Sequence, residues 1–201
     1  MCIRDRYKPV FTIIFIALIF WEAQAQNPVK WYSFEEALEL QQIEQRKIVI
    51  DVYIESCKWC KQMDKSTFQK THIANYLNEN FYPVKLDAEQ KEDINFAGQR
   101  FSFVDQGKSR SYHEFALAVT KGQLSYPTIV FIDEGMNIIQ SIPGFRTALE
   151  FEMIMTYFGE DQHKNIPWSS YQDNYVPMRI QFKQNSDKEL KPVLPAKFNG
   201  Q

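Results

Sequence analysis

The sequence predicts an α/β domain with a central mixed β-sheet flanked by helices. A run of β-branched residues over 48–54 indicates a buried strand, a helix follows it, and a second strand is expected over 81–86. This strand–helix–strand order implies parallel pairing with a right-handed crossover. A further strand over 129–132 leads through a turn into an antiparallel edge strand over 138–142, so the sheet should contain both kinds of pairing.

The helices are marked by their caps and by apolar residues at helical spacing. Residues 33–36 (Ser-Phe-Glu-Glu) form a capping box that should open a helix ending near Arg46. A second helix is predicted over about 57–80 and a last one over 147–158. Residues 168–184 fit no single pattern.

Between the second and third strands the chain becomes polar, and residues 88–123 are predicted to be a helical insertion. A second capping box, over 111–114, would open one of its helices. The domain should therefore span 26–160, followed by a C-terminal extension over 161–201 that is expected to be disordered from 185 onward. The aromatic residues of the insertion are expected to form a local core: Phe101, Phe103, Tyr112 and Phe115.

The first 25 residues are predicted to be a signal peptide. Arg4, Arg6 and Lys8 precede an apolar run over 10–21, and residues 23–25 (Ala-Gln-Ala) form a small-residue cleavage site. The apolar run is shorter than the roughly 20 residues that a membrane-spanning helix needs. The protein should therefore be periplasmic or otherwise exported, and in contact with a membrane only if this segment stays uncleaved.

Removal of that segment takes Cys2 away and leaves Cys57 and Cys60 as one pair. A bridge over so few residues closes a very short loop and adds little stability, so chemistry explains the pair better than structure. Both cysteines lie at the start of a predicted helix, where unpaired N–H groups and the helix dipole favour a thiolate. Cys57 is the expected nucleophile and Cys60 the resolving thiol. A plain surface bridge or half of a zinc site is the alternative.

Other classes of chemistry find little support in the sequence. His72, His113 and His163 stand at no spacing that would complete a four-ligand zinc site with the cysteines, so neither a metal nor a cofactor is expected. The formal net charge is -2 and no basic run stands out, so nucleic acid is not an expected partner.

These residues together carry a family resemblance. A strand, Cys57-Lys-Trp-Cys60 on a helix, another strand, and then Tyr126-Pro127-Thr128 before a hairpin and a final helix resemble the thioredoxin-fold thiol-disulfide oxidoreductases. Residues 77–81 (Leu-Asn-Glu-Asn-Phe) and 84–87 (Val-Lys-Leu-Asp) are similar to the exported bacterial thioredoxin-like branch, with a helical insert before the proline. The resemblance covers roughly 31–158 and implies a thioredoxin-like fold.

The resemblance also implies roles for five further residues. Asp51, six residues before Cys57, matches the buried acid of thioredoxins, and Lys85 falls where that family pairs a lysine with it. A buried carboxylate acquires the raised pKa that a proton acceptor for Cys60 needs. Pro127 would be a cis-proline beside the cysteines. Together with Tyr126 and Trp59 it would form the surface that binds the substrate.

From the residues alone, plainer interpretations stay open. Asp51 could be a solvated acid at a sheet edge, and Lys85 a solvent-facing strand lysine. Pro127 could be a trans-proline at the start of a strand, since cis is the minority state of X–Pro bonds. Trp59 could be a hydrophobic residue that only covers the start of a helix.

Two departures from the family pattern leave the redox direction open. Ser56 replaces the tryptophan usual before the first cysteine, and Lys58-Trp59 replaces the Gly-Pro of thioredoxin. Because this dipeptide tunes the redox poise, its identity here leaves reductase, oxidase and isomerase open. The sequence thus predicts an exported oxidoreductase that reduces or rearranges protein disulfides with an unidentified electron donor. The alternative, of another class, is a non-catalytic thioredoxin-fold protein-binding module in which the insertion and the extension recognise a partner.

Overall fold

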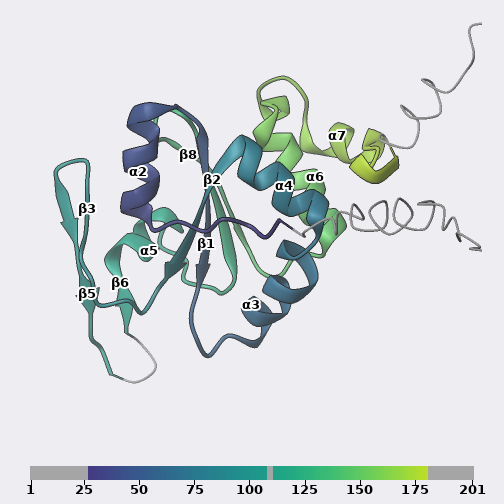
Figure 1. The fold of residues 1–201 in the computed structure, drawn as a ribbon. Helices are drawn as coiled ribbons and strands as arrows, with labels where there is room; N and C mark the ends of the chain where they lie inside the picture. The colour runs from purple at the N-terminus through teal and green to yellow at the C-terminus, as the bar shows by residue number, and fades with distance from the viewer. Residues whose placement is uncertain (1–26, 108–110, 181–201) are drawn as a thin grey trace, which may run out of the picture.

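The computed structural model describes residues 27–107 and 111–180, and its centre is a four-stranded sheet (Figure 1). The strand order is β2 (Phe81–Asp87), β1 (Lys47–Tyr53), β7 (Thr128–Ile132) and β8 (Ile138–Pro143). β1 pairs parallel with β2, whereas β1 with β7 and β7 with β8 are antiparallel, which confirms the mixed sheet. The predicted signal peptide, with Cys2, and the predicted disordered tail lie outside the described residues.

Helices cover both faces of this sheet (Figure 1). α2 (Phe34–Ile43) and the short α5 (Glu114–Val119) lie on one face, whereas α3 (Lys58–Met63), α4 (Thr71–Asn80) and α6 (Ala148–Gly159) lie on the other. α2 opens with the predicted capping box, in which Ser33 and Glu36 each accept the other's backbone N–H. No helix in the described part of the chain is long and apolar enough to cross a membrane.

The alternation of side chains along β1 decides which residues face which helices. Ile48, Ile50 and Val52 are fully buried in the cluster under α2 and α5. Val49 belongs to the opposite cluster, under α3, α4 and α6. Because successive side chains of a strand point to opposite faces, Asp51 shares the face of Val49. The central acid of β1 therefore points into the half of the core that the cysteine helix covers.

The single helix predicted over 57–80 is wrong, because the chain breaks it into three parts. α3 ends at Met63, a π-helical turn follows over Asp64–Phe68, and α4 begins at Thr71 after Lys70 adopts an extended backbone. Tertiary contacts hold this turn: Asp64 forms an ion pair with Lys85, and Thr67 Oγ1 donates to the carbonyl of Arg146 at 2.8 Å. The spacing of apolar residues in the sequence carries no information about such contacts.

The regular structure in the insertion over 88–123 is more strand than helix, so the prediction of a helical insertion is wrong. β3 (Ile94–Phe96) pairs with β4 (Gln99–Phe101) through a two-residue turn, where Ala97 and Gly98 have φ of 52° and 76°. β5 (Phe103–Val104) pairs with β6 (Tyr112–His113), and α5 is the only helix among the described residues of the insertion. Its N-cap is His113, whose Nδ1 accepts from the N–H of Phe115, not Ser111.

Aromatic packing explains why this insertion forms strands. The rings of Phe96 and Phe34 lie 5.3 Å apart, and those of Phe101 and Phe115 also 5.3 Å apart. Alternate residues of the two short strands thus cover α2 and α5 with aromatic surface. Of the four aromatic residues expected to form a local core of the insertion, Phe101 and Phe115 therefore pack in the main core of that face, whereas Phe103 and Tyr112 are not part of that cluster.

The C-terminal extension, ambiguous in the sequence, packs against α6. It contains a 3₁₀ turn (Gln162–Lys164) and α7 (Trp168–Asn174). Glu152 of α6 is 3% exposed, and its carboxylate accepts from Tyr175 Oη at 2.7 Å and from the N–H of Met178 at 2.6 Å. His72 of α4 lies 3.0 Å from the other oxygen of Glu152. One buried acid therefore ties the extension to two helices.

Candidate functional site

Cys57 and Cys60 form a disulfide at the beginning of α3, with their Cα atoms 5.3 Å apart. The loop after β1 brings Cys57 to the N-cap position, where its Sγ accepts from the N–H of Cys60 at 3.0 Å. Cys57 is half-buried, whereas Cys60 is 2% exposed. A backbone donor aimed at Sγ would stabilise a Cys57 thiolate after reduction.

Asp51 and Lys85 form an ion pair beneath this helix. They are direct partners in the parallel register of β1 and β2, and Lys85 Nζ lies 2.5 Å from Asp51 Oδ2. Asp51 is 1% exposed, and its Oδ1 is buried without a hydrogen-bond partner among the described residues. Both plainer interpretations, a solvated Asp51 and a solvent-facing Lys85, are therefore wrong.

The pKa values of this pair follow from burial and charge. Burial raises the pKa of Asp51 from its ordinary 3.8 to about 6, because removal from water outweighs the attraction of Lys85. Burial alone would lower the pKa of Lys85, but Asp51 and Asp64 outweigh that effect and raise it. Asp51 is therefore an acid that changes protonation state near neutral pH, beside a lysine that stays charged.

Asp64 is a member of this group that the sequence did not indicate. It forms a second ion pair with Lys85, so one ammonium serves two carboxylates. The rings of Trp31, Tyr53 and Phe68 surround the same ammonium at 4.8, 5.1 and 5.4 Å from their centroids. The position of Asp64 depends on the π-helical turn, so no sequence spacing would have found it.

Replacement of Asp64 by Asn is expected to lower the pKa of Asp51. The charge of Asp64 opposes ionisation of Asp51 and competes for Lys85, and the variant removes both effects while it keeps the shape. Carboxyl NMR titration of the wild type and the variant measures the shift directly. Asp93→Asn, at another ion pair in the insertion, is the matched control. An unchanged or raised Asp51 pKa would contradict the coupling.

Trp59 lies between the two cysteines and is 63% exposed. Its ring centroid is 5.5 Å from that of Phe145, in the loop between β8 and α6. Phe145 thus brings a second aromatic ring next to the exposed side chain of Trp59. Phe145 is a second residue that the sequence did not indicate, because it is distant along the chain.

Tyr126 and Pro127 lie in the loop that enters β7, and the peptide bond between them is cis. The carbonyl of Pro127 accepts from the N–H of Gly144 at 2.7 Å. Thr128, the next residue, faces Val52 in the register of β1 and β7, so this loop lies at the same end of the sheet as the cysteine loop. Tyr126 is half-buried, and burial raises its pKa to about 12.

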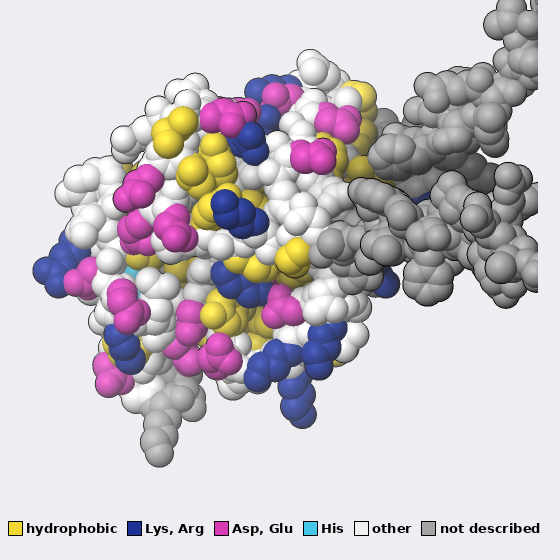
Figure 2. All heavy atoms as spheres, in the orientation of Figure 1, with side chains coloured by type: hydrophobic (Ala, Val, Ile, Leu, Met, Phe, Trp, Pro, Cys, Tyr) yellow, Lys and Arg dark blue, Asp and Glu magenta, His cyan; other side chains and the backbone are white. Residues whose placement is uncertain are grey.

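Charge gives no sign of a polyanion site on the visible face. In Figure 2, basic and acidic side chains are interspersed, with apolar atoms between them. No cluster of three or more histidine, cysteine or acidic side chains fit to hold a metal occurs in the described ranges. The chemistry that the site offers is that of the disulfide and of the buried acid.

Comparison with known proteins gives a family match over more than half of the chain. Residues 17–137 match the family described as "Thioredox_DsbH: Protein of unknown function, DUF255". Spermatogenesis-associated protein 20 of Rattus norvegicus is 38% identical over 72 residues, which is 35% of this chain and 9% of the rat protein. An uncharacterised protein of Caenorhabditis elegans is 31% identical over 84 residues, 41% of this chain and 12% of that protein. The chain thus matches only about a tenth of these relatives.

A structure titled DsbH oxidoreductase has a TM-score of 0.49 and 14% identity, over 70% of this chain and 92% of that one. A thioredoxin-fold protein from Helicobacter pylori has a TM-score of 0.49 and 16% identity, over 71% and 86%. The strand order β2-β1-β7-β8, the disulfide at the start of α3 and the Tyr126–Pro127 loop make the fold thioredoxin-like. The chain therefore belongs to the Thioredox_DsbH (DUF255) family.

Proposed function

We propose that the protein is an exported thiol–disulfide oxidoreductase that reduces or rearranges disulfides of other proteins. The observation that carries the proposal is a disulfide at a helix N-terminus together with a buried acid, on the face of the sheet that this helix covers, whose Oδ1 has no partner in the described structure. The apolar run over 10–21 and the Ala-Gln-Ala sequence after it support export. N-terminal sequencing of the mature protein, expected to begin at Gln26, tests cleavage.

The reaction divides between the two cysteines. In the reduced protein, the Cys57 thiolate attacks one sulfur of the substrate disulfide, forms a mixed disulfide, and releases the other substrate sulfur as a thiolate that takes up a proton. The Asp51 carboxylate accepts the proton of the Cys60 thiol. The Cys60 thiolate then attacks Cys57 Sγ, which re-forms the Cys57–Cys60 disulfide and releases the second substrate thiol.

A donor dithiol completes the cycle. It reduces the Cys57–Cys60 disulfide by the same two exchanges in reverse and is itself oxidised to a disulfide. Lys85 holds the Asp51 carboxylate in place through Oδ2 and leaves Oδ1 for the proton. Trp59, Tyr126 and Pro127 are proposed to contact the substrate chain, because they lie around the same end of the sheet.

Equilibration with glutathione is expected to open and close the Cys57–Cys60 disulfide reversibly. After mild reduction, iodoacetamide should label Cys57 first, because Cys60 is 2% exposed and Cys57 Sγ has a backbone donor. Mass spectrometry after an acid quench measures both results across pH, with Ser56→Ala as the matched control.

A bridge that resists mild reductant would instead favour the binding-module alternative. Preferential labelling of Cys60 would reverse the assigned roles. The same titration gives the redox direction, because the position of equilibrium with glutathione separates a reductase from an oxidase.

A further inference from the structure

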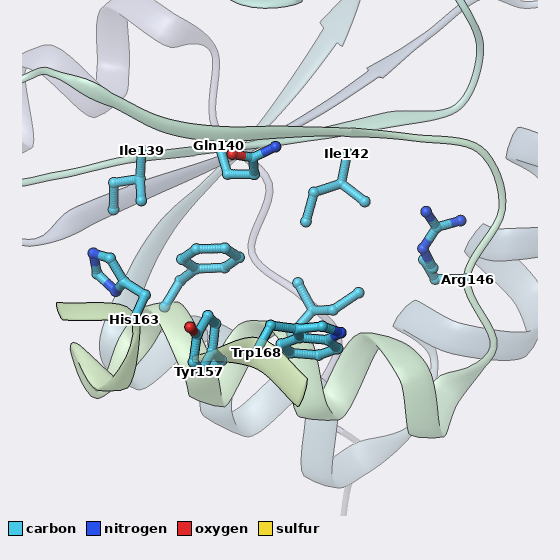
Figure 3. Close-up of a pocket in the computed structure, with 9 residues that line it drawn as sticks. Ile139, Gln140, Ile142, Arg146, Tyr157, His163 and Trp168 are labelled. Carbon is cyan, nitrogen blue, oxygen red and sulfur yellow. The ribbon is translucent and has the colours of Figure 1, made fainter. Parts of the chain in front are cut away.

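A groove runs along the outer strand of the sheet, between β8, α6 and the C-terminal extension (Figure 3). Its volume is about 540 Å³, within the range of sites that bind ligands or peptide side chains. Arg146 lies at one end and His163 at the other (Figure 3). Its apolar lining comes from all three elements: Ile139, Ile142, Ile154, Tyr157, Phe158 and Trp168.

Hydrogen bonds fix the wall that the extension contributes. Tyr157 Oη donates to the carbonyl of Ile166 at 2.6 Å, and Tyr171 Oη donates to Thr156 Oγ1 at 2.9 Å. The ring of Trp168 lies 5.1 Å from that of Tyr157 and remains 36% exposed. A large apolar side chain is thus held open to solvent on a fixed wall, which is typical of an interaction surface.

The groove leads to the disulfide. β8 runs toward the cysteine end of the sheet, because Pro143 faces Thr128 and Thr128 faces Val52. From Ile139 to Pro143 this path is about 13 Å long. Arg146 follows Phe145, whose ring meets that of Trp59 between the two cysteines. A chain that lies in the groove therefore leaves it toward the cysteine end of the sheet, next to Phe145 and Trp59.

The charge at the disulfide end of the groove is not neutralised. The guanidinium of Arg146 donates to the carbonyls of Phe145 and Pro143, and no ion pair joins it to an acid in the described structure. Glu150 is within electrostatic reach, but its Oε2 accepts from the N–H and the hydroxyl of Thr147. A carboxylate from a bound molecule would complement Arg146.

Side chains of the protein itself hydrogen-bond to outward carbonyls of β8, which limits the ways in which a bound chain could pair with this strand. Gln140 donates to the carbonyl of Ser141 at 3.2 Å, and Arg146 occupies that of Pro143. Pairing of an added strand along this edge is therefore restricted. Recognition must come from side chains that enter the apolar groove.

We propose that this groove binds an extended apolar segment of the polypeptide whose disulfide Cys57 reduces, with an acidic residue between that segment and the cysteine. The acid meets Arg146 and the apolar side chains fill the space beneath Trp168. The inference names the substrate class of the proposed function and rests on it, but the binding step can be measured without any redox chemistry.

Calorimetric titration of the full chain with synthetic peptides tests the binding step. The probe peptide carries serine in place of the cysteine, then an aspartate, then four apolar residues; its control has serines for the apolar residues. The probe should bind at least about tenfold more tightly than its control, and Trp168→Ala should remove that difference. Arg146→Gln should remove the preference for aspartate over asparagine in the probe.

Two surface variants serve as matched controls. Ile43→Ala truncates a side chain that is 84% exposed on α2, and Lys121→Gln removes a charge from an exposed position after α5; neither should change peptide binding. Equal binding of the probe and its control by the wild type overturns the proposal. Self-association of the wild type in ultracentrifugation, if Trp168→Ala abolishes it, also overturns the proposal. A second copy of the chain would then occupy the groove.

Turnover of matching disulfide substrates separates this inference from the proposed function. Trp168→Ala should raise KM for the apolar peptide disulfide about tenfold and leave kcat, and the rate with a small disulfide such as bis(2-hydroxyethyl) disulfide, unchanged. If Trp168→Ala reduces the rate with the small disulfide as much as the rate with the apolar peptide disulfide, the inference is overturned. If no disulfide is reduced by any variant but the probe still binds through Trp168, the proposed function fails and the groove stands as a peptide site.

Discussion

Cys60→Ser is expected to accumulate a stable mixed disulfide between Cys57 and its substrate. Cys57 lies at the helix start and is accessible, so the first exchange proceeds, but no internal thiol remains to attack Cys57 Sγ. Turnover of a protein disulfide such as that of insulin should fall by about three orders of magnitude. Acid-quenched samples on non-reducing gels measure the adduct, and mass spectrometry identifies what reductant releases.

Cys57→Ser is the matched comparison for this experiment. The remaining thiol, Cys60, is 2% exposed and lacks the N-cap hydrogen bond, so adducts should be far fewer, although turnover is lost to a similar extent. More adducts with Cys57→Ser than with Cys60→Ser would exchange the two roles. Adducts with neither variant, together with an inert bridge in the wild type, would favour a binding module over an enzyme.

Asp51→Asn is expected to slow turnover about 100-fold and to remove the rise in rate as the pH passes through about 6. Below that pH the wild-type carboxyl is protonated and cannot accept the proton of Cys60; above it the carboxylate is free to do so. The amide of the variant keeps the shape but accepts no proton at any pH. Single-turnover rates from pH 5 to 9 give the profile, and identical profiles would remove Asp51 from the mechanism.

The same substitution should change how stability depends on pH. Because the folded pKa of Asp51, about 6, is above its ordinary 3.8, the folded state holds a proton that the unfolded chain has released. The contribution of protonated Asp51 to the free energy of unfolding is complete below the unfolded pKa and is lost as the pH rises through the folded pKa. This contribution is about 3 kcal/mol. Urea unfolding of wild type and Asp51→Asn at pH 4 and pH 8 should show this loss in the wild type only.

Much of the sheet was predictable because local patterns and tertiary structure agree there. Residues 48–52 are buried on both faces of the sheet, so a run rich in β-branched residues is what this central strand requires. The hairpin also formed as expected: the N–H of Met136 donates to the carbonyl of Asp133 at 3.0 Å, although it is Met136, not Gly135, that has a positive φ, 66°. The cysteine pair was readable because both members lie within one helical turn.

The prediction of a helical insertion failed because local pattern and tertiary structure disagree there. Its polar composition resembles that of exposed helices, and only the presence of Phe34 and Phe115 from elsewhere in the fold gives Phe96 and Phe101 a surface to cover as strands. The break after Met63 is similar, since Lys85 and Arg146 hold the π-helical turn from outside the helix. Strand propensity and helix continuity both depend here on partners distant in sequence.

The sequence by itself indicated the cysteine pair, from its spacing at the start of a predicted helix, and Asp51, from the resemblance to the buried acid of thioredoxins. Their roles as nucleophile, resolving thiol and proton acceptor stay predictions. Only the tertiary structure decided the state of that acid. The register that places Lys85 beside Asp51, the turn that brings Asp64 to the same ammonium, and the burial of Oδ1 are all set by contacts between separate elements. The same holds for Phe145 against Trp59 and for the groove beneath Trp168. Such contacts join residues far apart along the chain, and no local pattern specifies them.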